Sequence, residues 1–504
     1  MNRIALDLSH QWPWLLPYLV LVAGGLLVMV VDAAVRTLRK EHLSMLALLT
    51  LLGSLVALLA APARPPADGL LGGMLDAGAF SRYLQALLLV IGMPVLVYAT
   101  GLYARDGRYR PEFYPLLLLA ILGMQVLVAA TNLLTLFLGV ETMSLAVYIL
   151  AGGNRGSLRS AEAGFKYLIL GAFASAILLM GSALLYGQAG GTDYAALSAA
   201  VGSSGATGFL LAAGAGLVLA AFAFKVALVP FHMWTPDVYD GAPAYTTALM
   251  ATGVKAAAVA ALVRFAWLLA PVVAPVWFPL LAVLAVATMT YGNLVALSQT
   301  GLKRLLAYSS IAHAGYLLLG VLALIAPARG GEQAIFQQQV GLAAGSALLF
   351  YLVVYAATNL GAFGIVVYLS RHRLDEADDS EGYAGLARRH PLAAATLAVC
   401  LLSLAGIPPT AGFMGKFYVF DAVVKAGLVP LAVWGVVNSL LSVYYYLRVV
   451  VLMYMQEPEQ EAWEGHGWET AFDAGLLAVV VLLLGVLPGA LHRAATWAFQ
   501  ALMS

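Results

Sequence analysis

The sequence contains one cysteine, Cys400, among 504 residues, and only 10% of its residues are charged. A single cysteine excludes an internal disulfide, a cysteine-ligated zinc site and a cysteine-ligated iron–sulfur cluster. The eight histidines show no HExxH spacing, and the chain has neither a GxGxxG motif following a strand nor a phosphate-binding P-loop. Any redox or nucleotide chemistry connected with this protein is therefore expected in another chain.

The balance of charge and hydrophobicity indicates a membrane protein. The chain is 62% hydrophobic and carries a net charge of +1, whereas soluble domains have about 25% charged residues. This composition predicts an all-α polytopic protein embedded in a lipid bilayer, with little room for a soluble domain and no nucleic-acid partner. The fifty glycines fit close packing of helix against helix in lipid.

Long apolar runs predict about fourteen transmembrane helices. The expected spans are Trp14–Val35, Leu43–Ala61, Phe80–Tyr103, Glu112–Ala130, Leu133–Leu150, Ala161–Gly187, Gly208–Val229, Tyr245–Leu269, Val276–Leu297, Lys303–Ile325, Val340–Leu369, Pro391–Asp421, Gly427–Met453 and Ala471–Phe499.

Basic residues concentrate in the loops that follow odd-numbered spans, which the positive-inside rule places in the cytoplasm. Both termini are therefore expected on the outer side of the membrane. One loop, 457–469, is acidic although it falls on the cytoplasmic side. The basic loop residues are Arg36, Arg39, Lys40, Arg105, Arg108, Arg110, Arg155, Arg159, Lys303, Arg304, Arg371, Arg373, Arg388 and Arg389.

The centre of the chain is the stretch 222–264, which holds two lysines inside apolar sequence. Pro230 breaks the first of the two runs, because proline cannot donate a backbone hydrogen bond. A broken helix beside Lys225 is either a kinked helix whose lysine reaches the headgroups or part of an ion path. Lys255 favours the ion path, because it lies roughly ten residues, or about 15 Å, from either end of its run.

A second interrupted span repeats this arrangement. The run 391–421 contains Pro408 and Pro409, followed by the embedded Lys416. Proline-interrupted spans at matching places in two halves of a chain point to a transport site in membrane transporters. The pattern predicts an internal repeat, although direct identity between the two halves is poor.

Glu141 is the carboxylate most deeply embedded in an apolar run. Ser144 and Tyr148 follow it on the same helix face, and Lys225 is the expected partner of the carboxylate. The alternative is a neutral carboxyl that bonds to a neighbouring helix. Lys416 has no acid nearby in the sequence.

Two histidines are candidate relay residues. His313 lies in the middle of its span and His232 lies beside the first break, and each could equally be a satisfied core residue. Three cations near span ends, Arg264, Lys303 and Arg304, are expected to anchor at the membrane interface.

Four motifs carry a family resemblance: VPFHMWTPDVYDGAPA, FLGVETMSL, KRLLAYSSIAHAGYLLLG and GIPPTAGFMGKF. Together they resemble the antiporter-like membrane subunits of bacterial NADH–quinone oxidoreductase, respiratory complex I, over roughly residues 112–453. The wider family includes the Mrp-type sodium/proton antiporters. Lysine at position 416 and the lack of a long carboxy-terminal lateral helix are most similar to the subunit N branch.

The resemblance implies fourteen helices with two inverted five-helix repeats, each containing a broken helix. The expected divisions are amino-terminal helices in 1–111, repeats in 112–270 and 271–455, and a cytoplasmic loop with a last helix in 456–504. The chain would translocate protons, with Glu141 and Lys225 as the coupling pair, Lys255 as the central relay and Lys416 near the periplasmic exit.

The same resemblance implies that this chain binds no cofactor or metal. NADH, FMN, iron–sulfur clusters and quinone would belong to partner subunits, and other membrane subunits of the complex would be its neighbours in the bacterial inner membrane. Two alternatives remain at this point: a subunit of an Mrp-type cation/proton antiporter, and a scaffold that does not pump. The span holding His313 has no acidic counterpart to Glu141, so the two halves are not expected to be equivalent.

Overall fold

The computed structural model describes residues 10–35, 41–66, 69–106, 109–204, 208–326, 334–370, 380–457 and 468–503. Its helices are α1 (Trp12–Ala34), α2 (Glu41–Ala60), α3 (Ala79–Asp106), α4 (Phe113–Ala129), α5 (Leu133–Ala151), α6 (Leu158–Ala189), α7 (Tyr194–Ser204), α8 (Phe209–Val226), α9 (Trp234–Gly241), α10 (Ala244–Leu249), the π-helical turn η1 (Met250–Val254), α11 (Lys255–Leu268), α12 (Ala270–Ala296), α13 (Leu302–Ile325), α14 (Ala334–Leu369), the 3₁₀ turn η3 (Ser380–Tyr383), α15 (Leu386–Arg389), α16 (Pro391–Ala405), α17 (Ala411–Lys425), α18 (Val429–Met455), α19 (Trp468–Val486) and α20 (Gly489–Met503).

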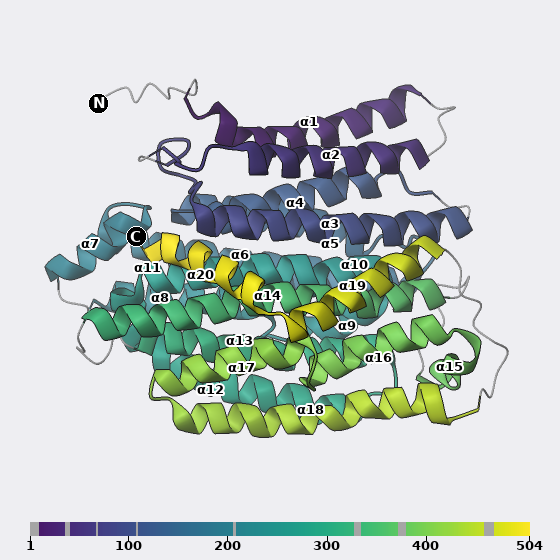
Figure 1. The fold of residues 1–504 in the computed structure, drawn as a ribbon. Coiled ribbons are helices and arrows are strands. Elements are labelled where there is room, and N and C mark those ends of the chain that lie inside the picture. Colours follow the sequence, from purple (N-terminus) through teal and green to yellow (C-terminus); the bar gives the residue numbers. More distant parts are fainter. Residues whose placement is uncertain are drawn as a thin grey trace.

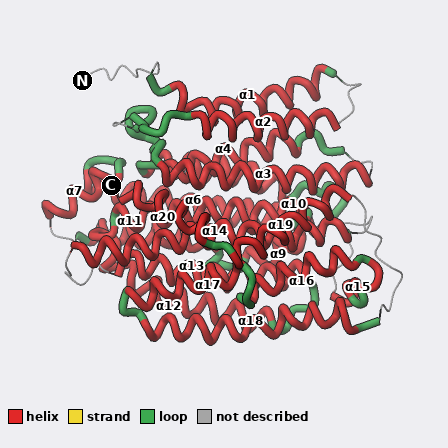
Figure 2. Tube along the Cα trace, viewed as in Figure 1, coloured by secondary structure: helices red, strands yellow, loops and turns green. Residues whose placement is uncertain are grey.

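The prediction of an all-α polytopic membrane fold is confirmed. Among the described residues, twelve helices are long and apolar enough to cross a membrane, and α4 and α16 are shorter apolar helices. The helices run side by side along one direction, with α1 and α2 at one edge and α18 at the other (Figure 1). Loops and turns lie mainly at the two ends of this bundle, with a few short stretches in its middle (Figure 2).

Burial identifies the centre of the bundle. In the spans 244–268 and Leu302–Ile325, the most apolar 18-residue stretch is entirely buried inside the protein. In α1 and α19, by contrast, only 28% and 22% of the corresponding 18-residue stretch is buried. The most protected helices, α10–α11 and α13, therefore hold Lys255 and His313, while the outer helices expose leucine and valine to the surroundings.

Glycines allow α4 and α5 to pack backbone against backbone. A Cβ atom added at Gly123 would lie 2.2 Å from the backbone nitrogen of Met143, and one at Gly139 would lie 2.7 Å from the backbone of Leu127. Such contacts require the absence of a side chain at both positions. They fix one face of α5 against α4, so that Glu141 faces away from this contact.

The carboxy-terminal span differs from the sequence prediction of one helix. The structure divides it into α19 and α20, with Leu487 and Pro488 between them. Pro488 has no backbone N–H to continue the first helix, and proline is well suited to the start of the next one. The short helix α7 was also not predicted. The basic segments 36–40, 107–108 and 371–379 and most of the acidic loop lie outside the described residues.

Arg264 corrects another expectation, because it is a buried residue rather than an interface anchor. It is 2% exposed, and its Nη2 donates to the Asp76 carboxylate at 2.7 Å and to Ser81 Oγ at 2.6 Å. Its guanidinium also lies 4.9 Å from the centre of the Phe80 ring. The pair joins the segment before α3 to α11, so it is a tertiary link that no local sequence pattern reveals.

Burial acts to raise the pKa of Asp76, but Arg264 and the hydrogen bonds from Ser81 and the Gly78 amide outweigh it and hold that pKa below its ordinary value of 3.8. A carboxylate whose pKa falls on folding stabilises the folded chain at neutral pH. That contribution is lost as the pH falls below the ordinary value and through the lowered one.

We expect Asp76→Asn to lower the free energy of unfolding by about 3 kcal/mol at pH 7, because it leaves the buried Arg264 without its counter-charge. The difference from the native protein should shrink as the pH falls toward 3. Thermal unfolding of the detergent-purified protein at several pH values measures this. Glu112→Gln is the control, since its partner Arg155 is 81% exposed. An equal loss in both variants would contradict this account of the pair.

Candidate functional site

Lys225 lies in the last turn of α8 and is 6% exposed. Its Nζ donates to Ser144 Oγ at 2.7 Å and to the Tyr148 hydroxyl at 3.1 Å, both on α5. The ammonium group also lies 5.3 Å from the centre of the Tyr148 ring and 5.9 Å from that of Tyr167 on α6. The lysine therefore sits in a pocket of hydroxyl groups and aromatic faces.

Glu141 is close to this pocket but does not contact the lysine directly. Its carboxylate accepts a hydrogen bond from Ser175 Oγ of α6, and it is half-buried. Among the described residues, Lys225 forms no ion pair with Glu141. Ser144, one turn along α5 from Glu141, is the group that Lys225 contacts instead. The Ser144 hydroxyl itself donates to the Val140 carbonyl of α5, so the described hydrogen bonds do not link Lys225 to Glu141.

Lys255 is 2% exposed and begins α11 directly after the π-helical turn η1. Its Nζ donates to the Ser310 carbonyl at 2.6 Å and also to Ser310 Oγ. The ring of Tyr355 is centred 5.8 Å away. A π-helical turn widens the backbone, and such turns are frequent at functional sites.

Lys416 lies in α17, is 4% exposed and has three oxygen acceptors. Its Nζ donates to the Leu404 carbonyl at 2.9 Å, the Ala405 carbonyl at 3.0 Å and Ser439 Oγ at 2.9 Å. Both carbonyls belong to the last turn of α16, where a helix leaves such groups without partners. The Tyr316 ring is centred 5.0 Å from the ammonium group.

Pro230 lies in the non-helical stretch 227–233 that separates α8 from α9. The helix ends at Val226 and is capped by Ala227, which has a left-handed backbone with φ of 65°. The Leu228 amide donates to the Ala223 carbonyl at 2.8 Å. The carbonyl of Phe224 accepts from the Ala227 amide and from Trp234 Nε1, each at 3.1 Å. In this break, unlike the second one, the lysine does not use the freed carbonyls.

Pro408 and Pro409 lie in the stretch 406–410 between α16 and α17. The cap matches that of α8: Gly406 has φ of 85°, and the Ile407 amide donates to the Leu402 carbonyl at 3.0 Å. The Pro408–Pro409 peptide bond is cis, as is the bond before Pro230. The two breaks thus share one type of helix end.

His313 occupies one face of α13 between the partners of two lysines. Ser310, His313 and Tyr316 follow one another at three-residue intervals, so they share a face of the helix. The imidazole is 3% exposed, with Nδ1 at 2.5 Å from the Tyr351 hydroxyl and Nε2 at 3.4 Å from that of Tyr446. This face connects the site of Lys255 with the ring beneath Lys416.

His232 lies within the first break, and its ring packs edge-on against Tyr291 at 4.7 Å between centres. Its Nδ1 is buried and has no partner among the described residues. The structure does not bring it into contact with any of the three lysines.

Each of the three buried lysines contacts a serine hydroxyl: Ser144, Ser310 or Ser439. A hydroxyl group both donates and accepts, so it can serve an ammonium group or a neutral amine. In the described part of the chain, none of the three buried lysines is ion-paired with a carboxylate. Within the same ranges, no group of three or more His, Cys, Asp or Glu side chains could hold a metal ion. The arrangement suits the movement of protons.

Sequence reasoning identified the lysines, Glu141 and His313 but missed most of the residues that contact them in the structure. Ser144 and Tyr148 were identified from their spacing to Glu141. The others come from distant helices, and the only local signal for them is a polar residue within an apolar run: Ser175, Ser310, Tyr351, Tyr355, Ser439 and Tyr446.

The profile of the family described as "NADH:quinone oxidoreductase/Mrp antiporter, TM" matches residues 130–442. The chain belongs to this family. Its matched region begins just before α5 and ends in α18, so it contains all three buried lysines and both breaks.

Individual proteins resemble the chain over nearly its whole length. NADH-quinone oxidoreductase subunit N of Myxococcus xanthus is 42% identical, with 97% of each chain covered. A chain of respiratory complex I from Thermus thermophilus is 33% identical with a TM-score of 0.78, covering 95% of this chain and 98% of that one. A chain of the Mrp complex from Dietzia sp. has the same fold at 23% identity and a TM-score of 0.79, covering 98% of this chain and 99% of that one.

We expect Ala227→Gly and Gly406→Ala to change stability in opposite directions. A left-handed backbone costs an L-residue about 1 kcal/mol, so glycine at 227 should relieve strain. Alanine at 406 would introduce strain and place a Cβ 3.0 Å from Lys416 Cδ. Thermal unfolding of the two purified variants measures the difference. Stabilisation by Gly406→Ala would show that the helix ends are not as described.

Proposed function

We propose that this chain is a proton-translocating membrane subunit of NADH–quinone oxidoreductase. The observation that carries the proposal is the burial of three lysines within the bundle, each near a helix break or a π-helical turn and each bonded to hydroxyl or carbonyl oxygens. Such residues are costly within a membrane and mark ion or proton paths.

In this function the proton path runs across the bundle. Glu141 and the Lys225 pocket form the coupling end, both built on α5, where Ser144 accepts from Lys225. Lys255 is the central relay, and Lys416 lies toward the periplasmic exit. His313 is supported as the intermediate between Lys255 and Lys416, because it shares a face of α13 with Ser310 and Tyr316. Water completes the contacts that the side chains do not make.

The division of the chain follows the two breaks. The first repeat contains α4 to α11 and the second α12 to α18, and the proposed bounds 112–270 and 271–455 fall within one residue of the start of α12 at Ala270. The segment 1–111 adds the amino-terminal helices, and 456–504 adds the acidic loop with α19 and α20. Each repeat then holds one broken helix with the same type of cap.

Partner chains carry out the electron transfer in this proposal. NADH, FMN, iron–sulfur clusters and quinone belong to other subunits, and neighbouring membrane subunits of the complex cover part of this bundle. The half-buried Glu141 supports such a neighbour, since its helix also exposes Leu138 and Leu145. The chain lies in the bacterial inner membrane with both termini in the periplasm, because basic loops stay in the cytoplasm.

A second candidate is a subunit of an Mrp-type cation/proton antiporter, whose members share the family profile and the fold. The two functions differ in energy source. In inverted membrane vesicles, NADH should drive proton uptake that does not depend on sodium. Sodium-driven proton exchange without NADH would favour the antiporter.

We expect Glu141→Ala to reduce NADH-driven proton uptake roughly tenfold or more, because it removes an acid–base group from the path. Glu141→Asp should retain part of the activity. Vesicles that contain the assembled complex, checked on native gels, provide the measurement. Glu112→Gln, a change in an exposed carboxylate, is the control. Normal pumping by Glu141→Ala would contradict the coupling role.

A further inference from the structure

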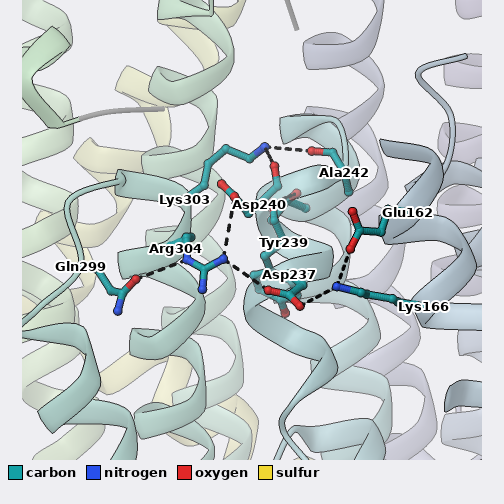
Figure 3. Close-up of polar contacts among 10 residues, drawn as sticks. Glu162, Lys166, Asp237, Tyr239, Asp240, Ala242, Gln299, Lys303 and Arg304 are labelled. Atoms are coloured by element: carbon teal, nitrogen blue, oxygen red, sulfur yellow. Dashed lines mark hydrogen bonds and ion pairs between the residues drawn. The ribbon is translucent and has the colours of Figure 1, made fainter. Parts of the chain in front are cut away.

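Asp237 lies in α9, the short segment that follows the first break, and it receives cations from two other helices. Its carboxylate accepts from Lys166 Nζ of α6 at 2.9 Å and from Arg304 Nη1 of α13 at 3.3 Å. Figure 3 shows the two cations approaching this carboxylate from opposite sides. We refer to Lys166, Asp237, Lys303 and Arg304 as the Asp237 ion cluster.

Lys303 completes the cluster at the end of α9. Its Nζ donates to the carbonyls of Asp240 and Ala242, the latter at 2.9 Å. Lys303 and Arg304 lie at the start of α13, where the helix dipole disfavours positive charge. The carbonyl groups at the end of α9 and the Asp237 carboxylate offset this unfavourable interaction with the helix dipole. The end of α9 and the start of α13 are therefore electrostatically complementary.

The helices joined in this way are those beside the buried lysines. Lys166 is followed by Tyr167, whose ring stacks on Trp234 of α9 at 4.4 Å between centres and lies 5.9 Å from the Lys225 ammonium. Arg304 is on the same helix as Ser310, which accepts both hydrogen bonds from Lys255. One carboxylate thus connects the surroundings of Lys225 with those of Lys255.

The carboxylate is ionised at neutral pH. Partial burial acts to raise the pKa of Asp237, but the hydrogen bonds and charges of Lys166 and Arg304 outweigh it and keep that pKa below its ordinary value. The link therefore keeps its charge at neutral pH.

We infer that Asp237 is a positioning residue that sets the separation of the Lys225 and Lys255 sites by holding α9 between α6 and α13. The inference rests on the proposed function. Asp237 contacts neither lysine, and it acts through the two helices that do. Proton transfer depends steeply on the distance between donor and acceptor, so a small displacement of α9 should slow it.

Stability alone would not distinguish this role. The Asp237 side chain is 43% exposed, and exposed ion pairs contribute little to folding. If the cluster were only a set of surface ion pairs, its loss would leave pumping unchanged. If it positions α9, the loss should reduce pumping in a complex that still assembles.

The test compares Asp237→Asn with Glu162→Gln in membrane vesicles that contain the whole complex. Both variants remove a carboxylate from Lys166, but Glu162 is on α6 itself and does not reach α9 or α13. Asp237→Asn should lower NADH-driven proton uptake roughly tenfold, and Asp237→Glu should recover part of it. Glu162→Gln should match the native complex.

A second readout follows the position of α9 itself. Hydrogen exchange of peptides covering 227–243 should become faster in Asp237→Asn and remain unchanged in Glu162→Gln. The double variant with Lys166→Gln and Asp237→Asn should pump nearly as well as Asp237→Asn alone. Both changes remove the same Lys166–Asp237 ion pair, so their effects should not add.

The outcomes separate the inference from the proposed function. Normal pumping and unchanged exchange in Asp237→Asn, with Glu141→Ala inactive, would overturn the inference alone. Equal losses in Asp237→Asn and Glu162→Gln would also overturn it, since the effect would then come from Lys166. Normal pumping by both Asp237→Asn and Glu141→Ala would instead overturn the proposed function.

Discussion

An ammonium group inside a membrane span requires acceptors that a regular helix cannot supply, because regular helices use their own carbonyls. In this protein a backbone distortion lies near each of the three lysines, but only Lys416 bonds to carbonyls that a helix end has freed. The end of α16 provides two carbonyls for Lys416. A π-helical turn precedes Lys255, which bonds to Ser310 of α13, and α8 ends one residue after Lys225, which bonds to hydroxyl groups of α5. The second break and the buried hydroxyl groups beside the lysines meet this constraint.

Helix α13 joins the separate lysine sites into one structure. At its start, Arg304 binds α9, and farther along the same helix Ser310 accepts from Lys255. His313 and Tyr316 then extend the polar face toward Lys416. Because α13 is enclosed on all sides, a change at one lysine can reach another through side-chain contacts without passing through lipid. In the proposed function, α13 lines the proton path at more than one of the lysine sites.

The sequence predicted the features that depend on local pattern. Long apolar runs gave the spans, and prolines at 230, 408 and 409 fall in the two non-helical stretches. It could not predict which helices meet, because side-chain periodicity says which residues share a face but not what packs against it. Lys225 thus contacts Ser144 rather than Glu141, and Arg264 is buried against Asp76 rather than anchored at the interface. The break at Pro488 was missed although proline was its local signal.

The central claim is that Lys255 exchanges protons rather than only supporting the fold. Lys255→Arg tests this most directly, because arginine keeps the charge and much of the bulk but stays protonated at any attainable pH. Proton uptake and NADH–quinone turnover should be measured side by side in vesicles, with assembly checked on native gels. We expect the assembled arginine variant to lose pumping as severely as Lys255→Ala. Near-normal pumping by the assembled Lys255→Arg complex would contradict the account and remove Lys255 from the path.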